Sequence, residues 1–183
     1  FFNAPGLGGA PTLSPILRPG GSNAGSSHGT ACYSICFADG NPTPAARGHL
    51  PLAQGYFSHA NYLRSSGSGT TRYNHTAGSV DLEIVFQTNS TGDPRTFLYT
   101  SISADTDTLL FDHDFLMCQS MSNASLIQDV RPQAWAKNMV SVGGIRHSNS
   151  LDRGTHFSQG STGPGQDGRI KPDLASFYDS VLA

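Results

Sequence analysis

Two segments of the sequence carry side chains that can do acid–base and electrostatic chemistry. His28 lies in Ser27-His28-Gly29-Thr30, at the start of an apolar run that contains cysteine, and Asn123 follows the run 116–122. An imidazole can accept a proton from a nucleophile, and a side-chain amide can donate a hydrogen bond to an oxygen that becomes negative during a reaction. The two side chains therefore supply a general base and an oxyanion donor, two parts of an acyl-transfer site.

Length and charge limit the functions that these residues can serve. The chain has 183 residues, of which 37% are hydrophobic, enough for the core of one domain. Its formal net charge is −2 and its 11 Lys and Arg residues are scattered, so neither nucleic acid nor an anionic membrane surface is an expected partner. No apolar stretch approaches the roughly 20 residues of a membrane span. We expect one soluble domain over residues 1–183.

The elements that must position these side chains follow from hydrophobic periodicity and from turn residues. Repeated Pro and Gly predict a loop-rich segment at 1–27, and Gly with Ser predicts a loop at 65–71. Helices are expected at 29–38, 73–80 and 100–112, and strands at 52–57, 82–86, 115–118 and 140–144.

Continuous apolar strands separated by helices indicate a mainly parallel sheet covered on both faces, which is a three-layer α/β/α domain. Ligands bind such sheets at the carboxyl ends of the strands. The loops at 87–92 and 119–125 both follow predicted strands, so we expect them to share one site.

Motifs in the second half of the chain accompany His28-Gly29-Thr30. They are Ala-Lys-Asn-Met-Val-Ser-Val-Gly at 136–143, Phe-Ser-Gln-Gly-Ser-Thr-Gly-Pro at 157–164 and Asp-Gly-Arg-Ile-Lys-Pro-Asp-Leu at 167–174. Together they closely resemble the subtilisin-like serine proteases, and they stand in the order that this family has. The resemblance implies the subtilisin-like α/β fold, here incomplete at both ends, and a secreted serine endopeptidase that acts on peptides or proteins. It implies no cofactor and no metal, except that calcium is common in the family; no ligand motif for it stands in this sequence.

The resemblance assigns roles residue by residue. It makes His28 the general base, with Gly29 leaving room for substrate, and Asn123 the oxyanion donor. It assigns six further residues to substrate binding: Ser90, Thr91, Gly92, Ser120, Met121 and Ser122. Segment 90–92 would pair as a strand with the substrate backbone, and segment 120–122 would form the other wall of the primary specificity pocket.

The sequence departs from the family pattern at several places. Ser27 and Ser122 stand where the family has Gly, no Asp precedes Asp39, and Gly-Thr-Ser-Met-Ala does not occur. We therefore expect this polypeptide by itself to be close to inert, with the Asp and the nucleophilic Ser supplied by the remainder of the same protease chain. The alternative is a catalytically dead pseudoprotease that binds peptide in an intact groove.

Other chemistries remain open from the residues alone. Gly25-Ser26-Ser27-His28-Gly29 matches the nucleophile elbow of α/β-hydrolases, with Ser27 as nucleophile, but the preceding Arg-Pro-Gly-Gly-Ser-Asn cannot be the buried strand which that motif needs. Asp105-Thr106-Asp107 matches the loop of aspartyl-phosphate phosphatases, with magnesium as cofactor, although a solvated helix start explains it better.

Smaller signals have plain structural explanations. Asp112, His113 and Asp114 suit a turn better than a metal site. Cys32 and Cys36, four residues apart, suit core packing better than a metal or redox pair. The sequons at Asn74, Asn89 and Asn123 are interpreted as chance matches, because glycans at the last two would block the proposed site.

Overall fold

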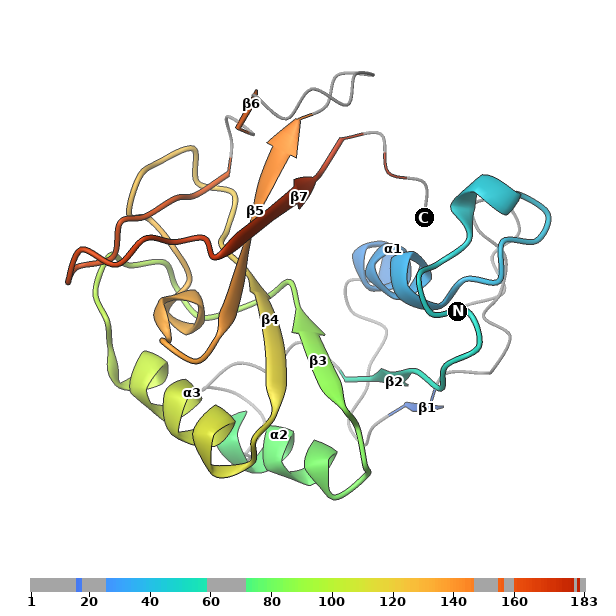
Figure 1. The fold of residues 1–183 in the computed structure, drawn as a ribbon, viewed down its shortest axis with the longest axis horizontal. Helices are drawn as coiled ribbons and strands as arrows, with labels where there is room; N and C mark the ends of the chain where they lie inside the picture. Colours follow the sequence, from blue (N-terminus) through green and yellow to red (C-terminus); the bar gives the residue numbers. More distant parts are fainter. Residues whose placement is uncertain are drawn as a thin grey trace. The chain divides into compact units, whose positions relative to one another are not determined.

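The computed structural model describes residues 16–17, 26–58, 72–146, 155–156, 160–179 and 181, with the backbone alone at 16, 17, 26, 155 and 156. The chain divides into two compact units, residues 1–59 with 181–183, and residues 60–180. Each unit has its own elements, which Figure 1 labels. The single domain over 1–183 stays a prediction, and the expected loop at 65–71 lies outside the described residues.

The first unit is built around one helix. Helix α1 spans Ser26–Phe37 and is followed by a short 3₁₀ helix at Pro44–Ala46, while β1 (Ile16–Leu17) pairs in parallel with β2 (Tyr56–Phe57). The predicted helix at 29–38 is confirmed, and it ends at Phe37, shortly before Gly40, which takes a positive φ of 85°, and Pro42. The strand expected at 52–57 is shorter than predicted, because only its last two residues pair.

The second unit alternates helices with strands. Its elements are α2 (Arg72–Val80), β3 (Phe86–Asn89), α3 (Ser101–Asp112), β4 (Leu116–Ser120), a 3₁₀ helix (Pro132–Trp135), β5 (Val140–Arg146), β6 (Thr155–His156) and β7 (Leu174–Phe177). The predicted helices at 73–80 and 100–112 and the predicted strands at 115–118 and 140–144 are confirmed to within a few residues. Within the described ranges, no helix combines the length and the apolarity needed to cross a membrane.

The sheet of the second unit is mainly parallel, as predicted. Strand β4 lies between β3 and β5, β7 pairs with the other edge of β5, and all these pairings are parallel, whereas the short β6 pairs antiparallel with the end of β5. A mainly parallel sheet with intervening helices is an α/β fold, so the predicted fold class is confirmed.

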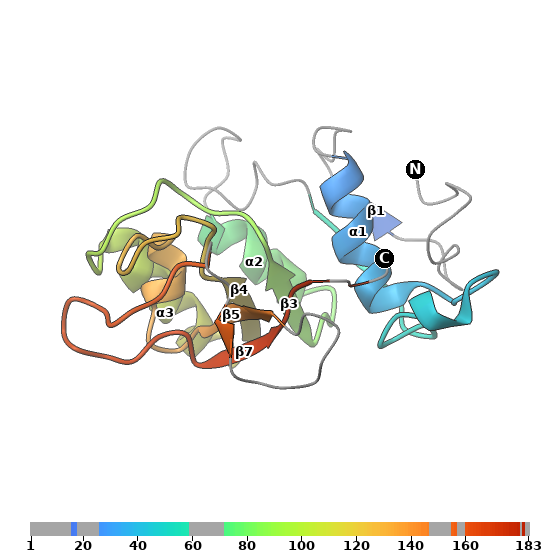
Figure 2. The same cartoon turned by 90° about the horizontal axis from the view of Figure 1, so that it is seen from above.

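Helices α2 and α3 lie side by side along one face of this sheet (Figure 2). Leu109 and Leu110 of α3 pack there with Met117 of β4 in the main apolar core, and each is at most 4% exposed. Residues that point to the opposite face are more accessible, since Leu116 is 52% exposed and Leu174 is 61% exposed. The second helical layer of the three-layer prediction is not found among the described residues of this unit and stays a prediction.

The predicted strand at 82–86 is wrong in its position. Residues 81–83 close the C-terminus of α2, where the N–H groups of Leu82 and Glu83 donate to the carbonyls of Ser79 and Val80, and Glu83 takes a φ of 56°. Val85 is 80% exposed. Strand pairing begins only at Phe86 and continues through polar Gln87–Asn89, because these residues lie next to β4. The apolar run therefore serves the end of a helix and not a buried strand.

The end of the motif at 167–174 ties β5 to the segment that leads into β7. Lys171 is 5% exposed, and its Nζ donates to Met139 O at 3.1 Å and to Asp173 Oδ2 at 2.7 Å. The same carboxylate oxygen accepts from the Ser141 N–H and hydroxyl, each at 2.7 Å. Burial by itself raises the pKa of Asp173, but the hydrogen bonds from Lys171 and Ser141 outweigh it, so the pKa lies below its ordinary value.

We expect Asp173→Asn to lower the free energy of unfolding at pH 7 by about 1–3 kcal/mol, because buried Lys171 loses its charged acceptor. A depressed folded-state pKa means that the ionised carboxylate stabilises the fold above the unfolded-state pKa, and that this contribution is lost as pH falls through the folded-state pKa. The loss caused by the substitution should therefore shrink between pH 5 and pH 3. Urea titrations over this range, with exposed Asp81→Asn as the control, test it; a loss independent of pH would contradict the assignment.

Candidate active site

His28 lies in the first turn of α1, and its side chain is exposed. One helical turn later, Cys32 places its Sγ 3.6 Å from His28 Nε2, which is the i, i+4 relation of neighbouring side chains on one helix face. The imidazole is therefore open to solvent, and a thiol contacts its ring nitrogen. His28 and Asn123 belong to different units, and their meeting in one site stays a prediction.

The residue after His28 is closely packed. A Cβ added to Gly29 would lie 3.2 Å from two ring carbons of Phe57, so an aromatic ring of β2 occupies the space beside Gly29 that the resemblance reserved for substrate. Cys36 follows Cys32 by one more turn, and burial, then its proximity to Cys32, raises its thiol pKa. The three cysteines of the chain form no disulfide in the structure.

In the second unit, the parallel register brings the two predicted loops together. Asn89 at the end of β3 pairs with Gln119 of β4, so residues 90–92 and 120–123 leave the sheet at the same edge. Gln119 Nε2 donates to Thr91 O at 3.0 Å, which joins the first loop to the second. The expectation that these loops lie side by side agrees with this geometry.

A buried pair of amides underlies the two loops. Asn89 is 4% exposed and Gln119 is fully buried. Asn89 Nδ2 donates to Gln119 Oε1 at 2.7 Å, while Asn89 Oδ1 accepts from the Thr91 N–H at 3.0 Å. Gln119 Nε2 also donates to Ser120 O at 3.2 Å. The Thr91 N–H is thus hydrogen-bonded to the Asn89 amide, and the Thr91 carbonyl to the Gln119 amide.

A buried ion pair follows segment 90–92 in the chain. Asp93 is 4% exposed and accepts hydrogen bonds from Arg72 Nη2, at 3.0 Å, and from Gln133 Nε2. Burial lowers the pKa of Arg72, and its hydrogen bond and charge interaction with Asp93 oppose that shift. Because an ion pair this deeply buried has no water to replace a lost partner, removing either side chain would leave an uncompensated charge.

Gly92 lies in a narrow space above this ion pair. A Cβ at Gly92 would approach Gln133 Oε1 to 2.6 Å and Arg131 Cβ to 3.2 Å, so a side chain there would displace the loop. Arg131 Nη1 donates to Gly92 O at 3.3 Å and to Asp93 O at 2.8 Å. The backbone at 92–93 is held on two sides.

The predicted oxyanion donor lies on an exposed turn with an unusual backbone. Asn123 is exposed, and the preceding Ser122 has a φ of 142°, a region that side chains disfavour and that explains the family's glycine at this position. Ser161, fully buried, holds both flanks of Asn123: its N–H donates to Ser122 O at 2.9 Å, and its hydroxyl accepts from the Ala124 N–H at 3.2 Å.

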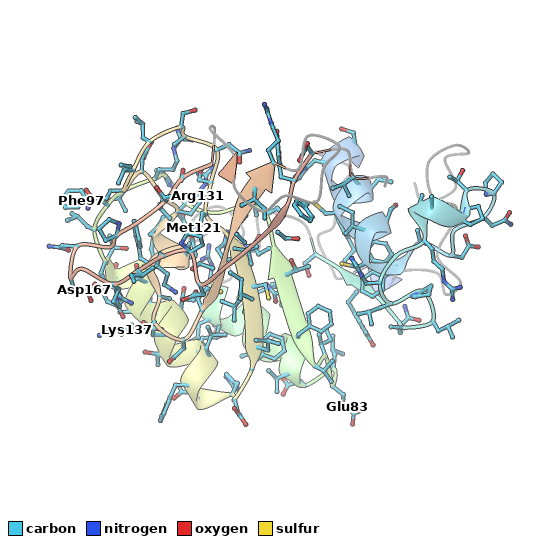
Figure 3. The ribbon with its side chains drawn as sticks, turned by 45° about the horizontal axis from the view of Figure 1, so that its top comes forward. Glu83, Phe97, Met121, Arg131, Lys137 and Asp167 are labelled. Carbon is cyan, nitrogen blue, oxygen red and sulfur yellow. The ribbon has the colours of Figure 1, made fainter. Side chains whose placement is uncertain are left out.

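Met121 supports this loop from inside the molecule. It is 1% exposed and belongs to a second apolar cluster with Val130, Ala134 and Trp135. Figure 3 labels Met121 beside Arg131, whose N–H donates to Met121 O at 3.2 Å. The Met121 side chain therefore anchors the wall at 120–122, and Ser120 and Ser122, which are half-buried, are more accessible than Met121.

The competing motifs lose support in the structure. Asp105 and Asp107 lie inside α3 and not at the end of a strand, and the Asp107 carboxylate accepts from the N–H groups of Lys137 and Asn138 at 2.8 and 2.6 Å. Its other partner is the Tyr99 hydroxyl at 2.8 Å; burial, then this hydrogen bond, raises the pKa of Tyr99 to about 12. Ser27 lies within the first turn of α1, whereas the elbow motif needs it on the turn between strand and helix.

The metal alternative and the glycan at Asn89 find no support either. His113 caps α3, Asp112 accepts from the Tyr73 hydroxyl at 2.8 Å, and Asp114 has a φ of 45°, as expected for a turn. Among the described residues, no group of three or more His, Cys, Asp or Glu side chains is placed to hold a metal ion. Asn89 is too deeply buried to carry a glycan.

Sequence reasoning missed several residues that shape this site, namely Asn89, Gln119, Arg131, Gln133 and Ser161. Polar residues at the ends of two adjacent predicted strands were the available signal for the first two. Arg131, Gln133 and Ser161 come from segments distant in sequence, and no local pattern marks them.

We expect Ser122→Gly to stabilise the protein by about 1 kcal/mol, because glycine adopts the φ of residue 122 without steric cost. The matched control is Ser120→Gly at the end of β4, which should destabilise by about 0.5–1 kcal/mol since strand glycine loses more entropy on folding. Thermal unfolding of both variants measures the difference. Equal destabilisation by the two substitutions would show that residue 122 is not strained.

Comparison with known proteins places these features in a family. The model of the Subtilase family matches residues 19–176. Among solved structures, the prenylagaramide maturation protease PagA is similar with a TM-score of 0.60 at 16% identity, over 82% of this chain and 51% of that one. The self-cleaved protease domain of PatA is similar with a TM-score of 0.56 at 18% identity, over 81% of this chain and 54% of that one.

These likenesses concern the fold, and the chain spans about half the length of both solved structures. No curated protein sequence matches it. The family model, in contrast, covers most of the sequence and includes every motif on which the resemblance was based. The chain belongs to the subtilase family.

Proposed function

We propose that this chain is the central part of a secreted serine endopeptidase of the subtilisin type, with His28 as general base and Asn123 as oxyanion donor. Family membership supports serine protease chemistry. The observation that carries the assignment of roles is the pair of loops 90–92 and 120–123, joined at the carboxyl edge of the sheet, with Asn123 exposed at the tip of the second.

In this proposal His28 takes the proton of a serine hydroxyl as that oxygen attacks the peptide carbonyl, and later gives it to the leaving amine. The serine and the orienting aspartate come from the remainder of the same protease chain. The Asn123 amide donates to the carbonyl oxygen as it becomes negative. The bonds from Ser161 on both sides of Asn123 support this role, because an oxyanion donor must be in position before charge develops.

The substrate lies between the two loops. Segment 90–92 pairs with its backbone as an added strand, and segment 120–122 walls the pocket for the side chain before the cleaved bond. The Thr91 N–H already donates to Asn89, so the pairing groups on this segment come from Ser90 and Gly92. The proposed chemistry needs no cofactor and no metal ion, and the partner is a peptide or protein.

We expect Asn123→Ala in the full-length protein to lower kcat about 10²–10³-fold with little change in KM, because the amide contacts the oxygen only as charge develops. His28→Ala should reduce cleavage to the residual level that lacks general-base catalysis. Exposed Asn74→Ala on α2 is the control and should retain wild-type kinetics. Steady-state cleavage of a fluorogenic peptide measures all of these.

Two outcomes would overturn the assignment. An Asn123→Ala variant with unchanged kcat and raised KM would make Asn123 a binding residue. The second outcome is a full-length wild-type protein that binds peptides but cleaves a proteome-derived peptide library no faster than His28→Ala does. That result would indicate the pseudoprotease instead.

A further inference from the structure

Two uncharged polar side chains, Asn89 and Gln119, occupy deeply buried positions on the sheet. Asn89 and Gln119 are neighbours across β3 and β4, on the face where Met117 packs against α3. Burying an amide costs free energy unless its donors and acceptors find partners. Every polar atom of the two side chains takes part in a hydrogen bond, and every partner is either the other amide or the backbone of Thr91 or Ser120.

The direction of these hydrogen bonds follows from a single backbone group. The Thr91 N–H can only donate, so the Asn89 atom that faces it must be Oδ1, and Asn89 Nδ2 must be the atom that meets Gln119. Gln119 therefore presents Oε1 to Asn89 and Nε2 to the carbonyls of Thr91 and Ser120. Rotating either amide by 180° would set donor against donor, so the network has one arrangement.

This arrangement determines which backbone groups of the loop can meet a substrate. The N–H and C=O of Thr91 both turn toward the amide pair. In the binding mode proposed above, a peptide that pairs with this segment therefore meets the residues on either side, Ser90 and Gly92. The Gly92 carbonyl accepts one bond from Arg131 and has a second lone pair.

We propose that Asn89 and Gln119 are positioning residues that hold segment 90–92 in register for an extended peptide and couple it to the oxyanion loop. The proposal rests on the protease function proposed above. Gln119 reaches both walls of the site, since its Nε2 binds Thr91 O in one loop and Ser120 O in the other. Loss of the pair would let the Thr91 backbone rotate, and segment 90–92 would lose the orientation that an extended peptide needs.

The test compares two substrates in the full-length protein. In the proposed binding mode, succinyl-Ala-Ala-Pro-Phe p-nitroanilide extends along the whole of segment 90–92, whereas N-acetyl-phenylalanine ethyl ester has the same residue before the cleaved bond and presents only its acetyl amide to that segment. Gln119→Met keeps the side-chain volume and removes all three hydrogen bonds. Gln87→Met is the matched control, because Gln87 lies two residues before Asn89 on the same face of β3 and its Nε2 has no hydrogen-bond partner in the described structure.

We expect Gln119→Met to lower kcat/KM for the tetrapeptide about tenfold, mainly through KM, and to change kcat/KM for the ester by less than about threefold. Gln87→Met should change neither. Asn89→Ser, whose hydroxyl can still accept the Thr91 N–H, provides a milder second variant with a smaller loss in the same direction.

Two results with these variants would overturn the positioning role. Equal losses on both substrates in Gln119→Met and Asn89→Ser would mean that the pair acts only through stability, and unchanged kinetics in both would mean that it does not position the segment. Either result overturns the positioning role and leaves the protease assignment intact. Failure of the wild-type protein to cleave both substrates and the peptide library would overturn the protease function, and the positioning role with it.

Discussion

The register between β3 and β4 is the constraint on which the proposed site depends. Parallel pairing sets Asn89 opposite Gln119, so the chain leaves both strands at the same edge and at the same height. A slip of β4 by one residue would turn Met117 and Gln119 to the exposed face and Leu116 and Cys118 to the helices. The apolar core under α3 includes Met117 and resists that slip. The packing of the core therefore also determines where the two loops lie.

The layer beneath the loops is polar, which is unusual for a buried region. The Asn89–Gln119 amide pair contacts the backbone of the first loop, and the side chain of the next residue, Asp93, forms a buried ion pair with Arg72 and a hydrogen bond with Gln133. Buried polar networks add little stability compared with apolar packing, but their directional bonds allow fewer arrangements. A loop that must present backbone groups to a peptide needs a defined orientation more than it needs extra stability, and this network provides it.

The motifs that reveal the family serve partly as structural links. The N–H groups of Lys137 and Asn138 both donate to the Asp107 carboxylate, which attaches this motif to α3. Lys171 and Asp173 join the segment before β7 to β5. Such links restrict which side chains fit, which is why these segments are recognisable in sequence although they lie outside the proposed chemistry. The residues proposed to act on substrate belong to shorter and less distinctive segments.

The sequence by itself determined the fold class, most of the helices and strands, and the family. These depend on hydrophobic periodicity, on capping and turn residues, and on motifs, all of which are local or ordered along the chain. It also indicated that loops 87–92 and 119–125 would meet, because parallel strands end at one edge. It misplaced the strand at 82–86, because the C-terminal cap of α2 used residues whose apolar character suggested a strand.

Only the tertiary structure decided which groups surround the proposed site. Arg72, Asp93, Arg131 and Gln133 meet across long separations in the sequence, and no local pattern specifies that Asp93 should accept from Arg72 and Gln133. The inward direction of the Thr91 backbone likewise depends on a side chain from the neighbouring strand. Hydrogen-bond partners are chosen by position in space after the sheet has assembled, and the periodicity of one segment carries no information about them.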